Sequence, residues 1–231
     1  MNTNLHLPQK NHPVAAQINR RKVPDIPPVI LDSPLMRRGG FDVFSGIANE
    51  YIKTSLLDEA FNQQPLITES LVTDTDSEEI RGGAPRRKFL SSPGGEFQRS
   101  FYHAGWLIDF LRSLTTPFLH PTGSYGTFSY YVRPDDFLEI HRDIVACDVA
   151  VITCLENSFG ADRSGGKLCL YPSRTDELLS DIRSSPEKGA YEFLLEAGQT
   201  IVFYGGIVPH ALLPVAKDQR RIVSVLCYEA L

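Results

Sequence analysis

Short apolar segments separated by glycine-rich turns dominate the second half of the chain, and this pattern restricts the fold more than any other feature. Segments rich in β-branched and aromatic residues follow one another at 126–133, 145–155, 167–171, 200–204 and 220–228. Turn residues separate them, including Gly-Gly pairs at 165–166 and 205–206. One helix is expected at 175–184. Because strands and helices do not alternate, the sequence predicts a mainly β fold with supporting helices, an antiparallel sandwich or barrel of the jelly-roll kind.

The first 120 residues have a different character. Residues 1–30 are polar and carry five of the sixteen prolines, which predicts a flexible arm. Two helices with one apolar face are expected at 41–61, with Ser45 as a candidate N-cap, and at 97–114. The stretch 68–96 between them predicts a long loop, either solvated or acting as a lid, with a basic group at 86–88. We therefore expect the arm and one domain (31–231), in which 31–120 supports a jelly-roll core at 121–231.

The composition limits location and partners. The chain has 231 residues, with 23 basic and 28 acidic side chains and a net charge of −5, so it lacks the basic surplus that nucleic-acid binding needs. No segment approaches the roughly 20 apolar residues of a membrane span, and no secretory signal is visible at the start. The four cysteines form no Cys-x-x-Cys pair and are expected to be buried thiols in a reducing compartment. These features predict a soluble cytoplasmic protein; they leave its oligomeric state open.

Three side chains are candidate metal ligands. His141 and Asp143 stand two positions apart at the end of a strand, so their side chains leave the same face. His210 opens a later strand that could fold back beside them. Two imidazoles and one carboxylate suit a non-haem Fe(II) centre, because they occupy one face of the metal and leave the other open. Taken alone, the triplet is better explained by a half-buried histidine beside a surface Arg142–Asp143 ion pair.

A candidate anion-binding residue follows the third ligand. Arg220 lies ten residues after His210, and the strand period of two places it on the same face as Ser224. A guanidinium can bind a carboxylate through two parallel hydrogen bonds, and a nearby hydroxyl can add a third. Arg221 is the alternative on the opposite face of the strand, and a β-bulge would reverse the choice.

In this order, these pieces resemble the 2-oxoglutarate- and Fe(II)-dependent dioxygenases, in particular their prolyl-hydroxylase-like branch. The resemblance spans about the last hundred residues and rests on Tyr131, His141-Arg142-Asp143, the segment 152–155, Gly165-Gly166-Lys167-Leu168, the segment 198–203, Pro209-His210, Arg220 and Ser224. It implies a double-stranded β-helix with iron at its mouth. It also implies that His141, Asp143 and His210 are the iron ligands. By the same resemblance, Arg220, Ser224 and Tyr131 hold the far carboxylate of 2-oxoglutarate.

The resemblance also implies a reaction. The cosubstrates would be 2-oxoglutarate and O2, with ascorbate as a possible reductant and with succinate and CO2 as coproducts. Because Asp143 is present where halogenating relatives carry a small residue, we expect hydroxylation of an unactivated C–H bond. The small size of the chain favours a small-molecule substrate, such as an amino acid or a natural-product intermediate. The alternatives are a protein hydroxylase of the prolyl type and a non-catalytic metal-binding jelly roll, in which Cys147 is the nearest candidate for a fourth zinc ligand.

Overall fold

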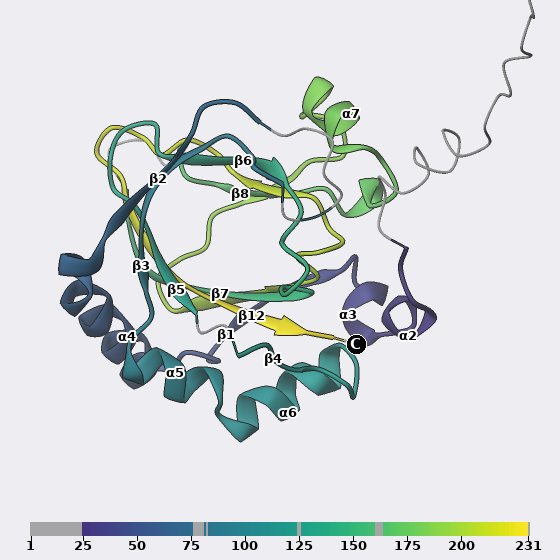
Figure 1. The fold of residues 1–231 in the computed structure, drawn as a ribbon, viewed down its shortest axis with the longest axis horizontal. Coiled ribbons are helices and arrows are strands. Elements are labelled where there is room, and N and C mark those ends of the chain that lie inside the picture. Colours follow the sequence, from purple (N-terminus) through teal and green to yellow (C-terminus); the bar gives the residue numbers. More distant parts are fainter. Residues whose placement is uncertain (1–24, 76–80, 82, 124–125, 160–163, 231) are drawn as a thin grey trace, which may run out of the picture.

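The strands form one curled sheet. The computed structural model describes residues 25–75, 81, 83–123, 126–159 and 164–230, and its 12-stranded sheet folds over into two facing layers (Figure 1). The larger layer contains, in spatial order, β1 (Phe41–Ser45), β10 (Gln199–Phe203), β7 (Val149–Ser158), β12 (Arg220–Glu229), β5 (Thr127–Tyr131) and β3 (Arg87–Pro93). The smaller layer contains β6 (Phe137–His141), β11 (His210–Leu212), β8 (Leu168–Leu170) and β9 (Tyr191–Phe193). Two further strands, β2 (Thr68–Val72) and β4 (His120–Pro121), pair with β3 and β12.

Strand β3 joins the two layers. Its residues 90–93 pair with β5 in the larger layer, and residues 87–88 pair with β6 in the smaller one. All the strand pairs are antiparallel, and each of the five apolar segments predicted as strands overlaps one. The jelly-roll architecture of a double-stranded β-helix is therefore confirmed.

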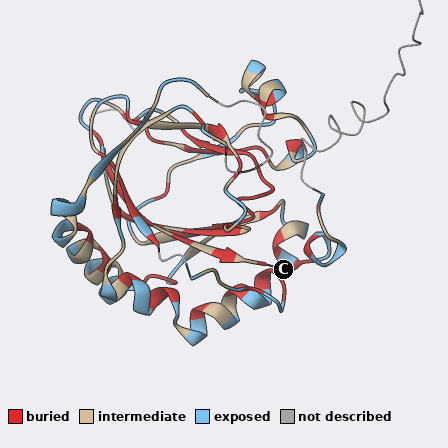
Figure 2. Cartoon of the chain, viewed as in Figure 1, coloured by how far each residue is buried: buried red, intermediate tan, exposed pale blue. Residues whose placement is uncertain are grey.

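Helices cover only one side of the larger layer. α4 (Glu50–Asn62), α5 (Glu96–Tyr102) and α6 (Gly105–Leu114) lie against its outer face (Figure 1), and their buried residues face the sheet (Figure 2). Leu56, Leu107 and Leu111 are fully buried there. These helices do not cover the inner face of the larger layer, which faces the smaller layer. The remaining short helices are α2 (Pro28–Leu31), α3 (Pro34–Arg37), η2 (Gln64–Leu66), η3 (Pro172–Arg174) and α7 (Leu179–Ser184). No helix in the described ranges is long and apolar enough to cross a membrane.

The first half of the chain differs from the sequence prediction. The helix expected from residue 41 begins at Glu50, and its cap is Asn49, whose Oδ1 accepts from the Ile52 amide at 3.0 Å. Ser45 instead ends β1, because residues 41–45 find hydrogen-bonding partners along β10 that local propensity does not reveal. The helix expected at 97–114 is two helices, α5 and α6, with non-helical backbone at Ala104 between them. Of the predicted arm, residues 1–24 lie outside the described residues, and 28–31 form α2.

The expected loop at 68–96 is instead largely a β-hairpin. β2 and β3 pair over five residues each, from Thr68 opposite Ser91 to Val72 opposite Arg87. Their sequences are largely polar, and β2 lies at an edge with all five of its residues exposed or half-buried, so the apolar alternation that marks a buried strand is weak. The tip of this hairpin falls partly outside the described residues, and the lid interpretation stays a prediction.

Two of the four cysteines form a disulfide. Cys147 and Cys227 are bonded across a sequence separation of 80 residues, whereas Cys154 and Cys169 are buried free thiols. The expectation of four free thiols is therefore wrong for the first pair. Cys227 lies on β12, which pairs with β7, and Cys147 precedes β7 by two residues, so the sheet brings the two sulfur atoms together. No sequence motif marks a pair this far apart.

Candidate metal centre

Neighbouring strands of the smaller layer bring the three candidate ligands together. His141 ends β6 and His210 begins β11, and these two residues are paired in the strand register. Their ring centroids are 4.2 Å apart. Asp143 Oδ1 lies 3.5 Å from His141 Nε2 and 3.6 Å from His210 Nε2, and ligand atoms of the three residues all lie within 4.8 Å of one another. The structure thus places all three predicted ligands around one point.

Backbone carbonyls fix the orientation of both imidazoles. His141 Nδ1 lies 2.8 Å from the Glu139 carbonyl oxygen, and His210 Nδ1 lies 3.0 Å from that of Val208. A carbonyl can only accept, so each Nδ1 carries a proton, and the Nε2 that faces Asp143 is the nitrogen left to bind a metal. This is the support that metal-binding histidines normally receive from their surroundings.

The charge states also suit a metal. Burial lowers the pKa of His141, and the neighbouring His210 lowers it further. Burial works against ionisation of Asp143, but the two imidazoles outweigh it and hold the pKa of this carboxyl below its usual range. The centre therefore offers an ionised carboxylate, and burial favours the neutral imidazole of His141. Within the described ranges the cluster has three members, which leaves positions on a metal for other ligands.

The segment that follows β6 is held from several sides. The Asp143 amide donates to the Gly205 carbonyl at 2.8 Å, and a Cβ on Gly205 would collide with the Asp143 carboxylate. Arg81 donates through Nε to the Asp143 carbonyl at 3.2 Å and forms an ion pair with Asp148 at 2.7 Å. The Cys147–Cys227 disulfide anchors the far end of this segment to β12. The position of the carboxylate ligand is thus set by the fold around it.

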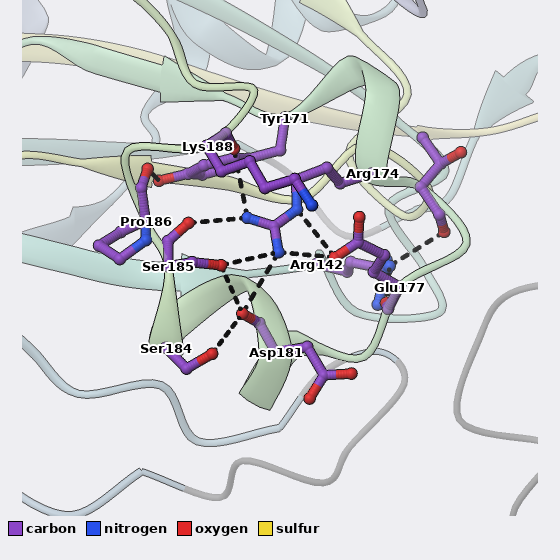
Figure 3. Close-up of polar contacts among 10 residues, drawn as sticks. Arg142, Tyr171, Arg174, Glu177, Asp181, Ser184, Ser185, Pro186 and Lys188 are labelled. Atoms are coloured by element: carbon purple, nitrogen blue, oxygen red, sulfur yellow. Dashed lines mark hydrogen bonds and ion pairs between the residues drawn. The ribbon is translucent and has the colours of Figure 1, made fainter.

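Arg142, between two of the ligands, serves as a brace. Its side chain is 1% exposed and donates to the carbonyls of Ile207 at 3.1 Å, Thr175 at 3.0 Å and Glu177 at 2.9 Å. Ile207 lies three residues before the third ligand, so Arg142 ties the two ligand-bearing segments together. The nearby Arg174 is similarly buried but binds the Glu177 carboxylate and residues 181–188 (Figure 3). The proposed surface ion pair between Arg142 and the adjacent aspartate is not formed.

A cavity of about 190 Å³ adjoins the three ligands between the layers. Its walls are mostly apolar, formed by side chains such as Phe89, Leu138, Ile152, Leu212 and Val223. Arg221 also lines it and is 1% exposed. Its Nη1 donates to the Gly166 carbonyl at 3.2 Å, whereas its Nε is buried and has no partner in the described part of the chain. A buried guanidinium edge without a partner is costly, so this edge points to an anionic ligand in the cavity.

Tyr131 stands beside this guanidinium. It is paired with Arg221 in the register of β5 and β12, lines the same cavity and packs against Phe89 at a ring-centroid distance of 5.0 Å. Burial raises the pKa of the Tyr131 phenol. The hydroxyl therefore stays protonated and can donate a hydrogen bond.

Arg220 and Ser224 lie away from the cavity. The Arg220 side chain is 52% exposed and forms an ion pair with Glu156 at 3.1 Å. The Ser224 hydroxyl accepts from Gln98 Nε2 at 2.7 Å, on the side covered by α5. Arg220 and Ser224 do share one face of β12, as the strand period of two predicts. The opposite face, which carries Arg221, is the one that lines the cavity. The pairing of β12 with β7 contains a register shift between residues 222 and 223, but the extra residue lies in β7. The alternation along β12 is therefore unbroken, and Arg221, Val223 and Val225 all line the cavity.

The sequence contained a signal for two further residues of the cavity. Thr127, Ser129 and Tyr131 alternate with Phe128 and Tyr130 along β5, and all three line the cavity. Counting back from Tyr131 with the strand period of two could have included both hydroxyls. Phe89 could not be found in this way, because its strand was interpreted as a loop.

The fold resembles that of solved oxygenases. No protein-family model and no curated protein matches the sequence. A prolyl hydroxylase from Trichoplax adhaerens, solved with a peptide fragment of the hypoxia inducible factor oxygen degradation domain, is 16% identical, with a TM-score of 0.58 over 96% of this chain and 94% of that one. HygX from Streptomyces hygroscopicus, solved with nickel, 2-oxoglutarate and hygromycin B, is 11% identical, with a TM-score of 0.60 over 86% and 84%.

A third solved structure with a similar fold is that of an epimerase rather than a hydroxylase. SnoN, a non-haem α-ketoglutarate-dependent epimerase from nogalamycin biosynthesis, is 13% identical, with a TM-score of 0.60 over 83% of this chain and 77% of that one. At these identities the likeness establishes a shared fold, that of the 2-oxoglutarate- and Fe(II)-dependent oxygenases.

Proposed function

We propose that this chain is an Fe(II)- and 2-oxoglutarate-dependent oxygenase that hydroxylates an unactivated C–H bond of a small molecule. The observation that carries the proposal is the pairing of two features in one cavity. An open His-Asp-His cluster lies at its mouth, and the buried Arg221 presents an unpartnered donor inside it. A dicarboxylate that can chelate a metal at one end and bind a guanidinium at the other fits both.

Each residue of the cavity has a separate task in this proposal. His141, Asp143 and His210 would hold the iron through two imidazole nitrogens and one carboxylate. When bound, Fe(II) would supply the activation of O2 that couples conversion of 2-oxoglutarate to succinate and CO2 with hydroxylation of the substrate. Arg221 would bind the far carboxylate of 2-oxoglutarate, with the Tyr131 hydroxyl as an additional donor.

The apolar walls contribute by excluding water. Leu138, Leu212 and Val223 surround the charged groups with hydrocarbon, which strengthens every electrostatic contact inside the cavity. We assign Arg221 the role that the sequence suggested for Arg220, because Arg220 is occupied by Glu156 at the surface. Ser129, which lines the cavity, replaces Ser224 as the candidate hydroxyl.

The direct test is consumption of 2-oxoglutarate. Purified protein loaded with Fe(II) should convert 2-oxoglutarate and O2 to succinate, with ascorbate present as reductant. Panels of free amino acids, natural-product scaffolds and peptides should then be compared for stimulation of succinate release. Stimulation by small molecules is expected, and hydroxylated product should be found by mass spectrometry. Turnover only with peptides would instead support a protein hydroxylase.

The protein-hydroxylase alternative has one specific support. The Trichoplax prolyl hydroxylase, solved with a peptide, aligns with 96% of this chain. The non-catalytic alternative requires a closed metal site. Among the described residues no fourth ligand joins the cluster, and Cys147, its nearest candidate from the sequence, is bonded to Cys227. Four-coordinate zinc without 2-oxoglutarate turnover would restore that alternative.

We also propose a cytoplasmic location, which the sequence favours and the Cys147–Cys227 disulfide opposes, since disulfides are rare in the reducing cytosol. Trapping thiols at the moment of cell lysis tests this. Reduced Cys147 and Cys227 in trapped protein are expected for a cytoplasmic protein. A disulfide already present at lysis would contradict that location.

A further inference from the structure

The mouth of the cavity contains a cation that the proposed mechanism does not use. Arg87 is the first residue of β3 and shares the inward face of this strand with Phe89. It lines a second hollow of about 220 Å³, which also reaches His141 and Asp143. Since this hollow borders the metal ligands from the open side, a molecule bound there would face the metal.

Arg87 is held in place but not neutralised. Its Nε donates to the Ser70 hydroxyl on β2 at 2.8 Å. The neighbouring Arg86 forms an ion pair with Glu139, and Arg133 forms ion pairs with Glu69 and Asp136. No carboxylate in the described part of the chain pairs with Arg87 itself, and its two Nη atoms have no partner there. The hydrogen bond to Ser70 therefore orients a guanidinium whose terminal edge is available to a ligand.

If Fe(II) and 2-oxoglutarate were bound as proposed, the positive charge of Arg87 would have no negative charge to balance it. Asp143 and the two carboxylates of 2-oxoglutarate would together offset the ferrous ion and Arg221. The cation at the mouth then has no counter-charge, in a hollow whose other walls include Phe89, Leu138 and Ile144. Guanidinium binds carboxylate through two parallel hydrogen bonds, and apolar walls suit a hydrocarbon part next to it.

We infer that Arg87 binds a carboxylate of the substrate, so that the substrate is a small carboxylic acid, a class that includes amino acids. This inference rests on the proposed function and narrows it. The carboxylate is held by Arg87, the aliphatic or aromatic part lies against Phe89, Leu138 and Ile144, and the reacting carbon faces the metal ligands. The hollow has a volume of about 220 Å³, which suits a ligand of this kind.

The experiment uses the full chain loaded with Zn(II) and the non-reacting 2-oxoglutarate analogue N-oxalylglycine, which occupies Arg221 and the metal. Binding of the analogue is measured first, as a rise in melting temperature. Ligand-observed NMR then compares propionate and benzoate with propionamide and benzamide. The variants are Arg87→Gln, the conservative Arg87→Lys, and the control Arg86→Gln, which changes the adjacent arginine that pairs with Glu139.

We expect the acids to bind more tightly than the amides, and their affinity to fall at least about tenfold in Arg87→Gln, the effect of losing a charge-assisted contact. Arg87→Lys should show an intermediate loss, because it keeps the charge without the fork, and Arg86→Gln should match the wild type. Equal binding of acids and amides, including none of either, would overturn the inference, as would unchanged acid binding in Arg87→Gln. Failure of the wild type to bind the analogue would overturn the proposed function itself.

Discussion

Replacing Arg221 by alanine should remove most of the affinity for 2-oxoglutarate. The side chain is 1% exposed in the cavity, and its Nε has no partner in the described part of the chain, so a bound carboxylate would gain a desolvated, charge-assisted contact. Losing one member of such a buried pair costs about 2–4 kcal/mol. This corresponds to an increase in Kd of about 30- to 900-fold.

Arg220→Ala is the matched control. This adjacent residue has the same charge, but its side chain is 52% exposed and pairs with Glu156 at the surface. An exposed ion pair contributes about 0–1 kcal/mol to stability, and its loss should leave the affinity for 2-oxoglutarate unchanged. The two variants remove the same charge from adjacent positions of β12. A difference in their Kd for 2-oxoglutarate therefore reflects which side chain points into the cavity and not the change in net charge.

Isothermal titration of 2-oxoglutarate into Ni(II)-loaded protein measures both Kd values, and circular dichroism verifies that each variant is folded. Arg221→Lys should recover part of the affinity, because it restores the charge in the cavity. The assignment would be refuted if Arg221→Ala bound 2-oxoglutarate within threefold of the wild type. A larger loss in Arg220→Ala would return the role to the residue that sequence parity favoured.

Three further substitutions, one of them with a matched control, test how the fold supports the site. Arg142→Met should weaken Co(II) binding about 10- to 100-fold, because the hydrogen bonds that connect the two ligand-bearing segments are lost. The control Arg174→Met changes a similarly buried arginine and should lower the melting temperature without changing the affinity for Co(II). Equal Co(II) affinities in the two variants would contradict the role of Arg142 as a brace. Gly205→Ala should reduce Co(II) binding at least about tenfold, since its Cβ would displace the carboxylate ligand; wild-type affinity would refute this steric argument. Cys147→Ser should lower the free energy of unfolding by about 2–5 kcal/mol in urea denaturation of oxidised protein, and alkylation of the unfolded wild type should count two thiols; four thiols would mean that the disulfide is absent.

The clustering of the three candidate metal ligands could be predicted because the spacing within one strand and the order of the strands point to the same place. His141 and Asp143 share a strand face by the period of two, and His210 follows at the start of a later strand. Antiparallel pairing of β6 with β11 then needs no unusual geometry to join them. The strands of the core could be predicted for a similar reason, since each is a short apolar segment between turns.

The choice between Arg220 and Arg221 could not be made in this way. Alternation determines which residues share a face, but the face that points inward depends on how β12 pairs with β5 and β7. The disulfide between Cys147 and Cys227 depends on the same pairing. Arg87 was seen only as part of a basic group, because the polar hairpin of β2 and β3 lacks the apolar pattern of a buried strand.

A crystal structure of the protein with Ni(II) and 2-oxoglutarate tests the central claim most directly. The account predicts one metal bound by His141 Nε2, His210 Nε2 and an Asp143 carboxylate oxygen, with 2-oxoglutarate chelating the metal and its far carboxylate on Arg221. A metal closed by a fourth protein ligand, or a 2-oxoglutarate molecule bound away from Arg221, would contradict it.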